Sequence, residues 1–205
     1  MKPIRRFSLL LVMGLALGQF SAGAGAEPSP PQSVITGLYD TLLGVMKEGP
    51  KLGFAGRYDR LKPAIEAAFN LPLMSRLSVG PQWQSLSPDE QARLTQAFSD
   101  FTISTYANRF DDYSGERLEV LPETGQAAGG IIVQSRLVKS DGEPVSLNYL
   151  MRQDEGRWQI VDVFLSGTIS ELATRRSEFT SVLRRDGAQG LLQLLDRRIA
   201  DLKVS

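Results

Sequence analysis

The sequence of 205 residues contains no cysteine and no histidine. Without cysteine the chain has no disulfide, no thiol nucleophile and no thiolate metal site, so its fold rests on an apolar core. Without histidine it lacks the commonest general base, the usual Ser-His-Asp arrangement and the ligands of most zinc sites. Catalysis by Asp, Glu, Tyr or Lys remains open, but these absences favour a protein that is not an enzyme and holds neither metal nor cofactor.

The chain also lacks an excess of charge of one sign, since it has 23 basic and 23 acidic residues. Proteins that bind nucleic acids use an excess of Lys and Arg to contact phosphates. We therefore expect no nucleic-acid partner. No heptad pattern calls for an oligomer, so a monomer is expected.

The first 26 residues have the pattern of a secretory signal peptide. A basic start is followed by an apolar stretch at 7–17 and by the A-x-A cleavage pattern of Ala24-Gly25-Ala26. The apolar stretch is shorter than the roughly 20 residues that span a bilayer, and no cysteine follows it for lipid attachment. We expect cleavage near Ala26 and a soluble mature protein in the periplasm.

The mature chain predicts a single domain with helices at both ends. Residues 27–32, rich in proline, are expected to form an extended tether before a domain that covers 33–205. Apolar spacing predicts helices over 33–49, 57–69 and 71–79, with Ser33 as the first N-cap and Gly49-Pro50 as the first stop.

Two later features mark helices more clearly. Ser87-Pro88-Asp89-Glu90 combines a capping box with proline at the first helical position, and the apolar pattern continues to about Phe110. At the carboxyl end, helices are expected over 170–185 and 188–202, separated at Asp186-Gly187.

Between these helices the apolar period changes from 3.6 to 2, which indicates strands. We expect strands over 118–122, 129–139, 145–152 and 157–165. Asp141-Gly142 and Glu155-Gly156 are tight-turn signals, so the four strands form an antiparallel meander. Helices, then a sheet, then helices make an α+β architecture.

Several short segments, in this order along the chain, are similar to the periplasmic lipid-carrier family that includes MlaC and the toluene-tolerance proteins. They are Val-Gly-Pro-Gln-Trp at 79–83, Leu-Ser-Pro-Asp-Glu-Gln at 86–91, Trp-Gln-Ile-Val-Asp-Val at 158–163, and 187–195. Two more segments, 110–116 and 167–179, resemble the hopanoid-associated branch, HpnM, more than MlaC itself.

The resemblance implies a curved antiparallel sheet of about four strands, wrapped by N- and C-terminal helices that enclose an apolar cavity. It implies a carrier that shuttles a phospholipid or a hopanoid-like lipid between an inner-membrane transporter complex and an outer-membrane complex. It brings no catalytic residues.

Apolar walls for such a cavity can come from one face of the sheet and from the helix before it. The alternating pattern alone favours ordinary core packing, because alternation reports burial and not emptiness; the resemblance favours a cavity for the face as a whole. The candidate lipid-binding residues are Phe98, Phe101, Tyr106, Phe110, Ile131, Val133, Leu137, Leu147, Tyr149, Met151 and Val163.

Two charged residues leave alternatives open. Arg176 is either an ordinary solvent-exposed helix cation, which is the default, or a contact for a phosphate headgroup or an acidic docking surface. Asp162 is either structural, capping the next helix or pairing with an arginine, or the base of a small periplasmic isomerase or hydrolase with the cone-shaped fold of ketosteroid isomerases. No second polar group stands at a catalytic spacing from Asp162, which favours the carrier.

Overall fold

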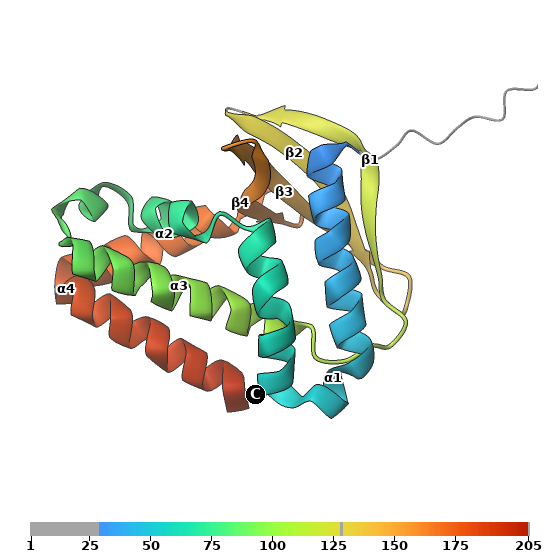
Figure 1. Cartoon of the computed structure of the whole chain (residues 1–205), viewed down its shortest axis with the longest axis horizontal. Coiled ribbons are helices and arrows are strands. Elements are labelled where there is room, and N and C mark those ends of the chain that lie inside the picture. Colours follow the sequence, from blue (N-terminus) through green and yellow to red (C-terminus); the bar gives the residue numbers. More distant parts are fainter. Residues whose placement is uncertain (1–28, 128, 205) are drawn as a thin grey trace, which may run out of the picture.

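A computed structural model describes residues 29–127 and 129–204 of the chain. The predicted signal peptide and the first two residues of the predicted tether lie outside the described residues. The described part is a curved antiparallel sheet flanked by helices from both ends of the chain (Figure 1). The α+β class and the sheet between N- and C-terminal helices are therefore confirmed.

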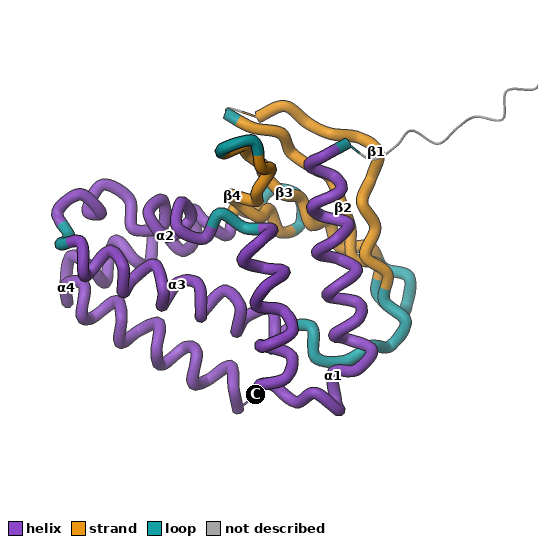
Figure 2. The backbone as a smooth tube through the Cα atoms, in the orientation of Figure 1, coloured by secondary structure: helices purple, strands orange, loops and turns teal. Residues whose placement is uncertain are grey.

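Figure 2 shows the succession of helices, sheet and helix along the backbone. The helices before the sheet are α1 (Pro30–Ala68), α2 (Leu71–Val79), the 3-10 helix η1 (Gly80–Ser85) and α3 (Pro88–Arg109). The strands are β1 (Arg117–Ala127), β2 (Gly130–Val138), β3 (Pro144–Asp154), β4 (Arg157–Leu165) and β5 (Ile169–Ser170), and α4 (Glu171–Val204) follows.

Helix α1 begins earlier than the sequence pattern predicts. Its N-cap is Ser29, and its first two residues are prolines, which fit there because the first helical N–H groups have no intrahelical partner. The predicted extended tether is therefore wrong at 30–32, and Ser33 is not the cap. The side chain of Gln32 accepts from the Ser29 N–H at 2.8 Å and donates to the Leu121 carbonyl at 2.9 Å, which fixes this end of α1 to strand β1.

The first half of α1 also ends later than predicted. The backbone leaves helical geometry at Gly53 (φ +60°), and the second half turns back toward the sheet (Figure 1). The predicted stop at Gly49-Pro50 was wrong, because a proline in the last turn before a reversal removes only one backbone donor. Arg57 fixes the reversal: its Nη1 donates to the Gly49 carbonyl at 3.1 Å and its Nε to the Ala107 carbonyl of α3 at 2.7 Å.

The predicted boundaries of α3 and the break in α4 are confirmed. Ser87 and Glu90 form the capping box, with the Ser87 N–H donating to Glu90 Oε2 at 2.8 Å and the Glu90 N–H donating to Ser87 Oγ at 3.3 Å. Helix α4 changes direction at Gly187, whose φ of +66° an L-residue adopts at a cost.

The sheet is a meander in the order β1-β2-β3-β4-β5. Gly142 (φ +89°) lies in the β2–β3 turn, and Glu155 and Gly156 both have positive φ between β3 and β4, as the turn signals predict. The fifth strand is absent from the prediction. It consists of two residues, Ile169 and Ser170, which pair antiparallel with the end of β4 and are too few to show a period.

The sheet face is covered in two ways. The first half of α1 packs directly on it: the Tyr39 hydroxyl lies 2.5 Å from Ser135 Oγ, and the Tyr39 and Tyr149 rings meet edge to face at 6.0 Å. Helix α3 instead packs chiefly against α4, α1 and α2. Its side chains face the sheet across a gap, which positions the site described below.

Gly49 provides a test of how α1 and the segment after α3 fit together. A Cβ at this buried position would lie 1.8 Å from the Asp111 carbonyl oxygen, whereas a Cβ at Gly44, in the same helix half, has nothing within 4 Å. We expect Gly49→Ala to lower the free energy of unfolding by about 1–3 kcal/mol through overpacking, measured by urea titration. Gly44→Ala is the control and should be neutral or slightly stabilising; equal stability of the two variants would contradict this account.

Candidate functional site

A cavity of about 420 Å³ lies between α3 and the sheet, within the roughly 300–1,000 Å³ typical of ligand pockets. Its walls come from α1, α2, α3, the three strands β2–β4 and the first turns of α4. Most of the lining side chains are aliphatic or aromatic: Met46, Phe69, Met74, Phe98, Tyr106, Phe110, Leu137, Leu147, Tyr149, Val163, Leu165 and Leu172.

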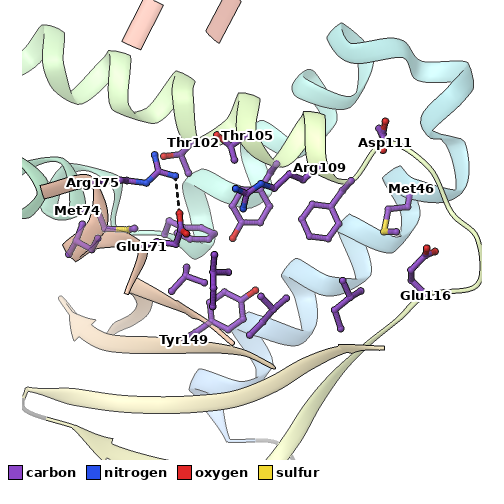
Figure 3. Close-up of a pocket in the computed structure, with 18 of the residues that line it drawn as sticks. Met46, Met74, Thr102, Thr105, Arg109, Asp111, Glu116, Tyr149, Glu171 and Arg175 are labelled. Atoms are coloured by element: carbon purple, nitrogen blue, oxygen red, sulfur yellow. Dashed lines mark ion pairs between the residues drawn. The ribbon is translucent and has the colours of Figure 1, made fainter. Parts of the chain in front are cut away.

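Polar side chains lie at both ends of this cavity, and Thr102, Thr105 and Arg109 of α3 lie between these ends (Figure 3). At one end Met74 lies beside the ion pair of Arg175 and Glu171. At the other end Met46 lies near Asp111 and Glu116, and the segment after α3 also adds Asp112 to the lining. The strands thus line the cavity with apolar side chains and Tyr149, whereas most of its polar side chains come from α3, from the segment after α3 and from α4.

The tyrosines of the cavity add little polarity to its walls. The Tyr106 ring stacks on Phe110 with centroids 5.6 Å apart and meets Phe69 edge to face at 5.6 Å. Burial raises the pKa of the Tyr106 hydroxyl and raises that of Tyr149 well above its ordinary value. Both phenols are consequently neutral at physiological pH and serve as aromatic wall.

Arg175 is the one largely buried cation among the cavity residues. Its side chain is 16% exposed and pairs with Glu171 at 3.7 Å, a long contact for an ion pair. The guanidinium carbon lies 4.6 Å from the Phe101 ring centroid and 5.8 Å from that of Phe98, within cation–π range. Burial lowers the pKa of Arg175 and Glu171 opposes this effect, but an arginine stays charged.

The structure brings seven of the eleven predicted lipid-binding residues to the cavity: Phe98, Tyr106, Phe110, Leu137, Leu147, Tyr149 and Val163. The other four lie elsewhere. Val133 and Met151 are fully buried in the packed core, Ile131 stands at the far end of β2 beyond the cavity, and Phe101 faces a neighbouring groove between α3 and α4. Val133 and Met151 alternate correctly, but the protein packs directly on them and leaves no space beside them.

The predicted headgroup or docking residue, Arg176, does not line the cavity. Its side chain is exposed and its Nε lies beside Gly80, near the junction of α2 and η1. Two other arginines line the cavity: Arg109 of α3 and the neighbour of Arg176, Arg175, which lies one residue earlier and therefore about 100° around the helix. The sequence reasoning also missed Met46, Phe69 and Met74, because α1 and α2 were assigned no role in the site.

Asp162 has a structural role. Its Oδ1 accepts from the N–H of Val163 at 2.8 Å and from the N–H of Leu172 at 3.1 Å, and its Oδ2 accepts from the Ser170 hydroxyl at 2.6 Å. It therefore caps the first turn of α4, which is one of the two alternatives left open by the sequence. Asp162 is 7% exposed and is not among the cavity-lining residues, so this geometry does not support a catalytic base.

Comparisons with known proteins place the chain in a family. The family model described as "MlaC protein" matches residues 37–197, most of the chain. The chain belongs to the MlaC family. A search of curated proteins found no match to this MlaC-family chain.

One solved structure with the same fold is described as the phospholipid-binding protein from Ralstonia solanacearum in complex with a phospholipid. It is 24% identical to this MlaC-family chain, with a TM-score of 0.74 over 85% of this chain and 99% of the other. At this identity the likeness shows the fold alone.

The described residues contain neither a cluster of His, Cys, Asp and Glu fit to hold a metal ion nor a helix both long and apolar enough to cross a bilayer.

Asp162 distinguishes the structural alternative from the catalytic one. We expect Asp162→Ala to lower the free energy of unfolding by about 0.5–2 kcal/mol, the usual loss for a helix cap, as measured by urea titration. A variant of unchanged stability would contradict the capping role.

Proposed function

We propose that this chain is a soluble periplasmic lipid carrier whose cavity holds the acyl chains of its cargo. The observation that carries the proposal is the cavity between α3 and the sheet, whose walls are mostly aliphatic and aromatic and whose strand side bears no charged residue of β2, β3 or β4. A water-filled space of this kind would be unfavourable, because its walls offer few hydrogen-bond partners. Acyl chains can fill the space and make van der Waals contacts with these apolar walls.

The energetics of an apolar pocket suit a carrier. Each methylene gains about 0.8 kcal/mol when it leaves water, so a lipid with roughly 30 methylenes gains on the order of 20 kcal/mol by being shielded. The lipid's free energy in the pocket is almost the same as in a membrane, because both environments exclude water. The cargo is thus protected during transit and remains free to enter an acceptor membrane.

Membership of the MlaC family supports a lipid as the cargo. The phospholipid bound to the structurally similar protein supports the chemical class of that lipid. We propose a phospholipid or a hopanoid-like lipid as cargo. The segments at 110–116 and 167–179 favour the hopanoid-associated branch, HpnM, as the chain's place within the family.

We further propose that residues 1–26 are removed as a signal peptide, so that residues 27–29 precede a single domain in the mature protein. We propose that the monomer passes lipid between an inner-membrane transporter complex and an outer-membrane complex. N-terminal sequencing of exported protein tests the first step. The expected first residue is Glu27; an uncleaved N-terminus would contradict free diffusion between membranes.

Lipid transfer between vesicles tests the carrier directly. Donor vesicles contain phosphatidylethanolamine with a self-quenching fluorescent headgroup, and acceptor vesicles contain none. We expect catalytic amounts of the protein to accelerate dequenching. Leu147→Trp, which fills part of the cavity, should lower the transfer rate at least about tenfold, the effect of losing roughly 1.4 kcal/mol of binding.

The matched control is Ile131→Trp, on the same face of the sheet but beyond the cavity, in a strand that pairs with β3. It should transfer lipid at the wild-type rate. Equal loss in both tryptophan variants would mean that the substitutions act on folding, and no transfer by the wild-type protein would overturn the proposal.

A further inference from the structure

A second hollow opens beside the lipid cavity, between α3 and α4. It also measures about 420 Å³ and is lined at one side by Phe101 and Leu202. Four residues line both spaces: Thr105, Arg109, Glu171 and Arg175. The two hollows therefore meet at a junction that contains two guanidinium groups and one carboxylate.

The donors at this junction are incompletely used. Nη1 of Arg175 is buried and has no hydrogen-bond partner among the described residues. A buried unsatisfied donor is uncommon and unfavourable, and for a charged group more so. Arg109 is exposed and forms no ion pair within the part of the chain that the structure describes. A ligand with hydrogen-bond acceptors can therefore pair with Nη1 of Arg175 and with the guanidinium of Arg109.

Charge at the two ends of the lipid cavity decides where an anion fits. The far end carries Asp111, Asp112 and Glu116, and its one lysine, Lys139, is paired with Glu143 at 2.7 Å. The junction end has two arginines against Glu171 alone. In the adjoining groove, Arg198 and Glu178 pair with each other, and Asp201 adds one carboxylate to the lining. A single negative charge is repelled at the far end and is complementary to the junction.

We infer that Arg109 and Arg175 form an anion subsite that binds the phosphate of the lipid headgroup, while the acyl chains occupy the apolar cavity and the rest of the headgroup lies in the groove between α3 and α4. Guanidinium groups suit this task because their planar donors match phosphate oxygens. The inference rests on the proposed function, and it makes a phosphate-bearing lipid a better cargo than a neutral lipid of the same chains.

Displacement of a neutral fluorescent probe, N-phenyl-1-naphthylamine, from delipidated protein tests the subsite. The competitors are dioleoylphosphatidylglycerol and dioleoylglycerol, which share their chains and differ in the phosphate headgroup. We expect the wild type to prefer the phospholipid. Arg109→Ala and Arg175→Gln should each weaken phospholipid binding about tenfold more than they weaken dioleoylglycerol binding, as expected for one charge-assisted hydrogen bond.

Arg176→Ala is the matched control, because this neighbouring arginine is exposed and lines neither hollow; it should keep the wild-type preference. Arg175→Lys keeps the charge without the planar donors and should fall between the wild type and Arg175→Gln. Arg109→Ala changes an exposed side chain, so the test survives if the Arg175 variants fold poorly.

The outcomes separate this inference from the proposed function. Equal binding of the two lipids by the wild type, or equal losses for both lipids in the arginine variants, would overturn the subsite and leave the carrier standing. Displacement by neither lipid would overturn both. Inorganic phosphate is titrated alone: weak binding that leaves the probe in place supports a headgroup site, and binding as tight as that of the phospholipid would assign the junction to a free anion.

Discussion

The structure depends on how the apolar face of the sheet is covered. Helix α1 closes one part of that face by direct contact, with the Tyr39 hydroxyl against Ser135 and its ring against Tyr149. Over the other part, α3 is supported by α1, α2 and α4, so it need not pack on the strands. The cavity is the space that remains. A core packed to ordinary density would have no such space, and the fold keeps it because each wall is anchored elsewhere.

Those anchors are polar, and their side chains are not among the cavity-lining residues. Arg57 joins the reversal of α1 to the last turn of α3, and Asp162 caps α4 from the neighbouring strand. The Asp162 cap fixes the first turns of α4, which is where Glu171, Leu172 and Arg175 reach the cavity. The same contacts that stabilise the fold therefore set the position of the charged end of the site, and the apolar walls are left free to hold a flexible chain.

The parts of this arrangement that local chemistry determines were predictable from the sequence. The Ser87–Glu90 capping box, the glycine turns and the break at Gly187 each depend on a few adjacent residues. The true start of α1 at Pro30 and its reversal at Gly53 were missed, because prolines fit a first turn as readily as a tether.

Alternation placed Val133 and Leu137 on one face but could not distinguish the packed residue from the cavity residue. That difference is set by which helix lies opposite, a long-range property. Likewise, Arg175 and Arg176 are adjacent residues of the same type. Which of them lines the cavity depends on how α4 is rotated about its axis.

The central claim is that the space between α3 and the sheet holds lipid. Its most direct test is mass spectrometry of a solvent extract from the exported form, purified without detergent. The account predicts lipid in the extract of the exported form at close to one molecule per chain. An extract free of lipid, together with a crystal structure in which side chains fill this space, would contradict it.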